Sequence, residues 1–137
     1  MLIIYDKIYL AGDNMDLNCI NIISLAYLGD AVYEVYIREK LLSLGNTKVE
    51  ELQKQAINYV SAKSQCRILN NLLDNNILTN EEIDIVKRGR NYKRASHPKN
   101  TDIITYKMST GFEALIGYLY LDNQKERLEE ILKNIEV

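Results

Sequence analysis

The feature that most constrains this chain is an acid in the middle of an apolar stretch, LAYLGDAVYE at residues 25–34. Because a buried carboxylate is costly unless something pairs with it, Asp30 needs either solvent or a partner. Glu34 follows one helical turn later on the same face. The simplest interpretation is that both acids point to solvent beside an apolar stripe. This stripe has the three- and four-residue spacing that predicts a helix, and it comprises Leu25, Leu28, Val32 and Val35.

A second stretch near the end of the chain, FEALIGYLYL at residues 112–121, repeats this pattern with Glu113 as its lone acid. Helices that are apolar nearly all round pack at the centre of a bundle, so we expect Asp30 and Glu113 to meet. Two buried carboxylates without an Arg partner favour a hard divalent cation such as Mg²⁺. The alternative for Glu113 is a half-buried acid that a Tyr or Lys satisfies. Close approach of the two backbones is allowed by the glycines at Gly29, Gly111 and Gly117.

The composition places few limits on function. A chain of 137 residues is long enough for one domain with a substantial core. Its net charge of −2 means that any nucleic-acid partner must be held by a local basic patch. No apolar run approaches the ~20 residues of a membrane span, and Asp6 and Lys7 interrupt the apolar start of the chain, so we expect no signal peptide and a cytoplasmic protein. Cys19 and Cys66 have no second Cys or His nearby to make a metal site and are expected to be reduced thiols.

Helical spacing and capping signals divide residues 16–137 into about six or seven helices, and no strong strand pair is present, which predicts an all-α fold. Residues 1–15 are predicted to form an N-terminal arm or a short strand. The expected helices span residues 16–44, 47–59, 61–73, 79 to near 89, 101–121 and 123 to about 135. The predicted N-terminal caps are Thr47, Ser61, Thr79 and Asn123, and Gly45 is the predicted stop of the first helix.

One basic segment stands out, KRGRNYKR at residues 87–94. Such a density of positive charge suits contacts with phosphates. The alternative is a solvated helix end, since the helix dipole favours cations there. The only histidine, His97, lies in the same loop next to Pro98, and we do not expect it to be a catalytic base. The chain contains no nucleophile elbow and no P-loop.

These motifs carry a resemblance to a known family. The segment at residues 25–32 resembles the signature helix of the ribonuclease III catalytic domain, and residues 112–117 resemble its second conserved motif. Several motifs resemble in particular the short bacterial branch, mini-ribonuclease III, which has the catalytic domain and no double-stranded RNA-binding domain. The resemblance covers about residues 20–135 with the motifs in the same order. The branch-specific motifs are residues 61–65, 87–91, 98–102 and 109–110.

The resemblance implies a Mg²⁺-dependent endoribonuclease that cuts double-stranded RNA into products with 5′-phosphate ends. Asp30 and Glu113 are then the catalytic and metal-binding residues, with residues 16–137 as the catalytic domain. Larger members of the family carry further acids at the positions of Ala26 and Thr110, and the short branch shares the reduced set. Glu34 is a candidate helper rather than a ligand. The candidate RNA-binding residues are Lys63, Lys87, Arg88, Arg90 and Lys99.

The resemblance also implies a homodimer, because one site cuts one strand of a duplex. The expected role is maturation of the large-subunit (23S) ribosomal RNA precursor, with a ribosomal protein as a helper. Two other functions remain open from the residues alone. One is a catalytically silent RNA-binding or ribosome-assembly module, which predicts RNA binding without cleavage. The other is a structural helical dimer, which predicts no affinity for RNA.

Overall fold

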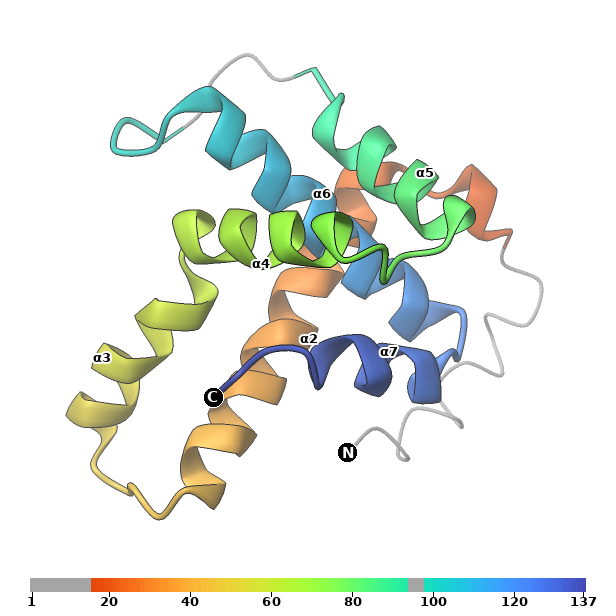
Figure 1. Ribbon diagram of the computed structural model, residues 1–137. Helices are drawn as coiled ribbons and strands as arrows, with labels where there is room; N and C mark the ends of the chain where they lie inside the picture. The colour runs from red at the N-terminus through yellow and green to blue at the C-terminus, as the bar shows by residue number, and fades with distance from the viewer. Residues whose placement is uncertain (1–15, 94–97) are drawn as a thin grey trace.

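The structure is a computed structural model that describes residues 16–93 and 98–137, and within these residues it is entirely helical. The predicted all-α class is therefore confirmed, whereas the predicted N-terminal arm lies outside the described residues. No helix among them is both long and apolar enough to cross a membrane. The elements in chain order (Figure 1) are the 3-10 helix η2 (Leu17–Cys19) and the α-helices α2 (Ile22–Ser43), α3 (Val49–Val60), α4 (Ala62–Asp74), α5 (Asn80–Arg90), α6 (Ile103–Leu121) and α7 (Lys125–Leu132).

Two of the predicted helix starts are confirmed. The Thr79 hydroxyl accepts a hydrogen bond from the Glu82 N–H at 3.1 Å, and the Glu82 carboxylate accepts one from the Thr79 N–H at 2.9 Å, which completes a capping box. The Ser61 hydroxyl accepts from the Ser64 N–H at 3.2 Å at the start of α4. Gly45, with φ +96°, ends α2 as predicted, because glycine adopts this left-handed backbone without strain.

Other predicted boundaries are wrong. The Thr47 capping box does not form, since α3 begins at Val49 and the Asn46 carboxamide accepts the Lys48 N–H at 3.2 Å instead. Asn123 does not cap α7, because its own backbone is left-handed with φ 58°. The helix expected from residue 16 is divided, and α2 begins only after the Asn21 side chain accepts a hydrogen bond from the Ile23 N–H.

Helix α6 is the centre of the fold. It packs against α2, α4, α5 and α7, and α4 crosses it in Figure 1. On the side that faces α2, the Phe112 ring meets the Tyr33 ring edge to face, with centroids 5.1 Å apart. Both rings are fully buried. Helix α3 lies at the edge of the molecule, where it contacts α2 and α4. The expectation that residues 25–34 and 112–121 belong to central helices is therefore confirmed.

The crossing of α2 and α6 depends on two glycines. A methyl group on Gly29 would overlap the main-chain carbonyl of Glu113, and one on Gly117 would overlap the carbonyl of Leu25. The Cβ of an alanine at Gly29 would also lie 2.8 Å from the Gly117 main-chain nitrogen. The two backbones are thus in direct contact, with no side chain between them. The predicted close approach at these glycines is confirmed.

An ion pair between Arg127 and the buried Glu82 links α7 to α5. The Arg127 guanidinium donates to both carboxylate oxygens of Glu82, at 2.7 and 2.8 Å, and to the Ile77 carbonyl at 2.7 Å. Burial raises the pKa of the Glu82 carboxyl, but the hydrogen bonds from Arg127 and Thr79 outweigh it, so the pKa is lowered overall. Because the geometry is bidentate and the carboxylate is satisfied, both charges are tolerated in this position.

We predict that Gly117→Ala lowers the free energy of unfolding by about 3 kcal/mol or more, at the upper end for overpacking, because the added methyl meets main chain that cannot rotate away. Chemical denaturation measures this loss. Gly45→Ala is the matched control, since no atom lies within 4 Å of its Cβ position. It should cost only about 1–2 kcal/mol for its left-handed backbone. Equal losses in the two variants would contradict the close crossing.

Candidate active site

The two acids singled out by the sequence lie at the crossing of α2 and α6. Gly29, which touches the main chain of Glu113, directly precedes Asp30. Glu113 is half-buried, whereas Asp30 is exposed, so the expectation of two buried carboxylates is wrong for Asp30. The reason is helical geometry, because each residue turns the helix by about 100° and the residue after the contact therefore points out toward solvent. The acids occupy the rim of the crossing and not its interior.

A third element reaches this place from α4. The Gln65 side chain is only 2% exposed, and its amide nitrogen lies 3.5 Å from the Glu113 carboxylate and 3.2 Å from the Val60 carbonyl. The sequence did not identify Gln65 as a site residue, although the segment at residues 61–65 was among the motifs typical of the short branch. Periodicity shows that Gln65 is on the inner face of α4, but it does not show which side chain it meets.

The chemistry of the donors suits a hard divalent cation. Asp30 and Glu113 offer carboxylate oxygens, and the described residues contain no group of three or more His, Cys, Asp or Glu side chains that could hold a metal. Mg²⁺ commonly binds through one or two carboxylates and keeps waters or substrate phosphates as its other ligands. The residues at the crossing therefore fit Mg²⁺, with most of its coordination shell left to water and other oxygen ligands.

The two positions at which larger relatives carry acids contribute no ligand here. Ala26 and Thr110 are both 3% exposed. The Thr110 hydroxyl donates to the Tyr106 carbonyl of its own helix at 3.0 Å, so it is already engaged. Neither position therefore adds a carboxylate to Asp30 and Glu113 at this crossing.

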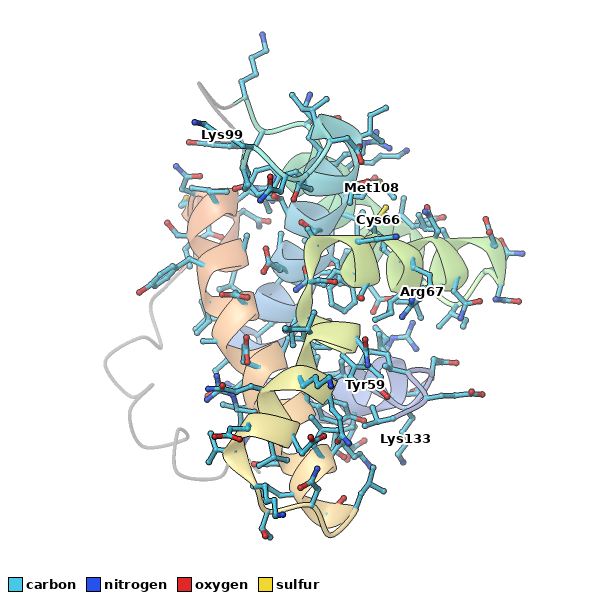
Figure 2. All side chains as sticks on the ribbon, turned by 90° about the vertical axis from the view of Figure 1, so that its left-hand side faces the viewer. Tyr59, Cys66, Arg67, Lys99, Met108 and Lys133 are labelled. Atoms are coloured by element: carbon cyan, nitrogen blue, oxygen red, sulfur yellow. The ribbon has the colours of Figure 1, made fainter. Side chains whose placement is uncertain are left out.

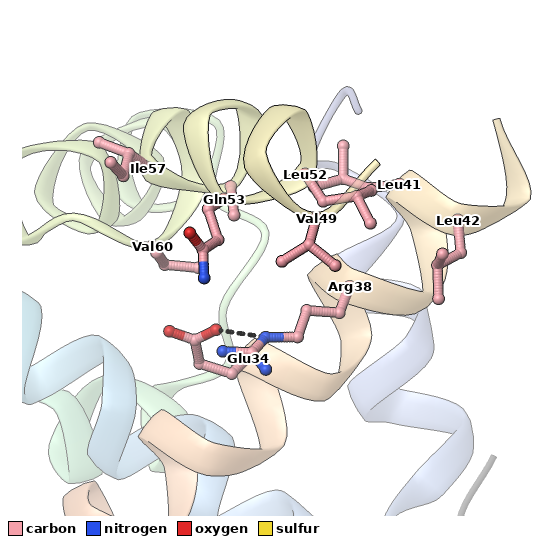
Figure 3. A pocket seen from close by; sticks show the side chains of 10 residues that line it. Glu34, Arg38, Leu41, Leu42, Val49, Leu52, Gln53, Ile57 and Val60 are labelled. Carbon is pink, nitrogen blue, oxygen red and sulfur yellow. Dashed lines mark hydrogen bonds and ion pairs between the residues drawn. The ribbon is translucent and has the colours of Figure 1, made fainter. Parts of the chain in front are cut away.

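Glu34 is paired with a neighbour on its own helix. Its carboxylate accepts a hydrogen bond from Arg38, one turn further along α2, at 3.1 Å. Both side chains line a groove between α2 and α3 (Figure 3). This pairing gives Glu34 a structural partner and does not support a role as a helper to Asp30.

The candidate RNA-binding residues lie on α4 and α5, which pack against α6, and in the segment before α6. On α5, Gly89 packs against Gly111 of α6, so the basic end of α5 lies beside the middle of α6, two residues along the chain from Glu113. Lys63 is exposed in the first turn of α4, two residues before Gln65. Lys99 extends into solvent ahead of α6 (Figure 2).

Of the remaining RNA-binding candidates, Lys87 and Arg88 are exposed and Arg90 is half-buried. His97 lies outside the described residues.

The domain is all-helical and carries two acids where two central helices cross at glycines. Comparison with known families identifies the class of protein to which it belongs. Residues 23–124 match the Ribonuclease III domain family. The chain therefore belongs to the ribonuclease III family and is an endoribonuclease. The alternatives of a silent RNA-binding module and a purely structural dimer are accordingly not favoured.

Within this family the chain is similar to the proteins named Mini-ribonuclease 3. The protein from Enterococcus faecalis is 50% identical over 117 residues, which cover 85% of this chain and 89% of that protein. The protein from Streptococcus pneumoniae is 48% identical over 118 residues, covering 86% and 92%. The crystal structure of protein FN1578 from Fusobacterium nucleatum superposes with a TM-score of 0.76 at 33% identity, covering 86% of this chain and 93% of that one. The resemblance to the short branch is thus confirmed.

Proposed function

We propose that residues 16–137 form a catalytic domain that hydrolyses double-stranded RNA with Mg²⁺ held by Asp30 and Glu113. The observation that carries this proposal is the contact between Gly29 and the main chain of Glu113, which brings the backbones of the two acids together. Although the two acids belong to separate helices, their backbones therefore lie next to each other. The products are expected to carry 5′-phosphate and 3′-hydroxyl ends.

Each acid has its own part in this mechanism. Asp30 is exposed, so its carboxylate is on the side that RNA can approach, while the half-buried Glu113 is restrained by the protein around it. When bound, Mg²⁺ supplies Lewis-acid activation of the attacking water and neutralises charge on the phosphate. The two carboxylates would hold and orient the ion, and neither needs to transfer a proton. A hydrolysis of this kind depends mainly on positioning and charge.

Duplex RNA is the substrate that the surrounding charges favour. A-form RNA is recognised mainly by its shape, through phosphates and 2′-hydroxyls across the shallow minor groove. Exposed cations lie on α4, on α5 where it packs against Gly111 near the middle of α6, and in the segment before α6. We expect these cations to contact the RNA backbone without reading its sequence. Because this is the electrostatic part of binding, the affinity should be sensitive to salt.

A homodimer is the form in which this site would cut both strands. Large apolar side chains remain exposed on α2, with Tyr27 at 85%, Val35 at 45% and Leu42 at 51% exposure. Exposed apolar surface of this size is typical of protein interfaces. The neighbouring groove between α2 and α3 adds Val49 and Ile57, which are 64% and 60% exposed (Figure 3). We propose that a second copy covers this face by two-fold symmetry.

The biological substrate we propose is the precursor of the large-subunit (23S) ribosomal RNA, processed in the cytoplasm. This rests on the similarity to the mini-ribonuclease branch. A protein that binds RNA only through a few surface cations should have a modest affinity for a bare duplex. A ribosomal protein bound to the same precursor is therefore the expected helper.

We predict that Asp30→Asn lowers the rate of duplex cleavage in Mg²⁺ by more than about 100-fold, since even outer-shell partners of a metal typically cost 10- to 100-fold. Cleavage of a labelled RNA duplex, with Mg²⁺ and with chelator, measures the effect. Asp74→Asn is the matched control, because Asp74 is another exposed helical aspartate. Circular dichroism should show both variants folded. Residual cutting by Asp30→Asn near the wild-type rate would refute the metal-binding role.

We predict that Lys99→Ala weakens binding to all duplexes alike and reduces the slope of log K against log salt by about 1, because one phosphate contact is lost. Binding titrations at several salt concentrations measure this. Lys133→Ala removes the same charge at the opposite end of the molecule (Figure 2) and should change neither quantity. A loss restricted to one RNA sequence, or an equal loss in Lys133→Ala, would argue against backbone contact by Lys99.

We predict that Tyr27→Asp converts the protein from a dimer to a monomer, because it places a charge on the proposed apolar interface at its most exposed side chain. Sedimentation velocity measures the change in mass. Ile104→Asp, at a position that is 72% exposed on α6, is the control and should leave the dimer intact. If Tyr27→Asp sediments as a dimer like the wild type, the α2 face is not the interface.

A further inference from the structure

Gln65 carries an unusual feature for a core residue. Its side chain is 2% exposed, yet its amide oxygen is the one buried side-chain nitrogen or oxygen without a hydrogen-bond partner in the part of the chain that the structure describes. Leaving a buried carbonyl oxygen unpaired lowers the stability of the fold. A methionine of similar size would fill the same space without that cost. An exception of this kind calls for an explanation other than packing.

The other end of the same amide has two partners. Its nitrogen donates to the Val60 carbonyl at 3.2 Å and to the Glu113 carboxylate oxygen Oε2 at 3.5 Å. Because both neighbours can only accept, the nitrogen and not the oxygen must face them. Gln65 therefore links the end of α3 to the carboxylate of Glu113, across the helix pair α4 and α6.

We propose that Gln65 is a positioning residue for Glu113, an inference that rests on the proposed role of Glu113 as a metal ligand. By binding Oε2 it restricts the rotation of the carboxylate. The contact of 3.5 Å is long, and such hydrogen bonds in free enzymes commonly tighten when the substrate complex forms. The Val60 carbonyl holds the amide from the other side, so that Gln65 itself cannot turn.

This restraint matters more here because the protein ligands are few. Ala26 and Thr110, the positions of further acids in larger relatives, offer no carboxylate. Because Asp30 and Glu113 are the two carboxylates proposed to hold the ion, rotation of Glu113 removes half of their contribution. An amide donor also fixes a carboxylate without adding a like charge beside it. A third acid at position 65 would repel Glu113 instead.

The test uses the full chain without RNA and measures Mn²⁺ binding by electron paramagnetic resonance. Gln65→Met should raise the Kd for Mn²⁺ about tenfold, the usual effect of losing a partner that orients a metal ligand. With RNA present, kcat should fall while KM for the duplex stays the same. Gln65→Leu is a second variant of similar size and should give the same result. Unchanged Mn²⁺ affinity in both variants would overturn the proposal.

Ser64→Ala is the matched control for a merely structural effect. Ser64 is the buried neighbour of Gln65, 6% exposed, and its hydroxyl bonds to Ser61 at 2.8 Å. Ser64→Ala should lower the melting temperature and leave Mn²⁺ affinity unchanged. A parallel loss of Mn²⁺ affinity in Ser64→Ala would mean that Gln65 acts only through the packing of α4.

A double-mutant cycle separates this inference from the proposed function. In a Glu113→Gln background, Gln65→Met should have no further effect on Mn²⁺ affinity, because the carboxylate it orients is absent. The same tenfold loss in that background would overturn the positioning role. If Asp30→Asn and Glu113→Gln bind Mn²⁺ as the wild type does, the proposed function fails. If Asp30→Asn and Glu113→Gln lose Mn²⁺ binding and Gln65→Met retains it, the inference on Gln65 fails and the proposed function stands.

Discussion

The direct contact between the backbones of α2 and α6 is the constraint on which the rest of this structure depends. It is possible only because Gly29 and Gly117 have no side chains, so each helix touches the main chain of the other. Glycine inside a helix lowers the stability of the helix by about 1 kcal/mol relative to alanine, and this crossing contains two such glycines. The benefit is geometric. Asp30 and Glu113 are brought to adjoining backbone positions, and the surrounding apolar core holds both helices rigidly.

The rest of the fold supports this crossing from the outside. Helix α5 approaches α6 through a second glycine contact, Gly89 with Gly111, and so carries its basic end to the middle of α6. Helix α4 contributes a buried amide on the remaining side. The two acids, the buried amide and the positive charge thus lie on α6 itself and on helices that share α6 as a common partner. A rigid centre with functional groups around its rim is a suitable basis for chemistry that depends on positioning.

The sequence was sufficient for the helical fold and for placing Asp30 and Glu113 on central helices, because those depend on local signals. The Thr79 capping box and the stop at Gly45 form as expected, since both are complete within a few residues. The Thr47 box fails because Asn46 competes for the same turn. The exposure of Asp30 and the contact of Gln65 with Glu113 could not be predicted, because they depend on how helices distant in the sequence are rotated against each other. Periodicity identifies the inner face of a helix but not its partner on the neighbouring one.

The most direct test of this account is the position of a bound ion in crystals of the wild-type protein grown with Mn²⁺, located by anomalous diffraction. The account predicts an ion within about 2.3 Å of one carboxylate oxygen from Asp30 and one from Glu113 of the same chain, with the remaining ligands supplied by water. Density for Mn²⁺ elsewhere, with the two carboxylates turned away from each other, would contradict it.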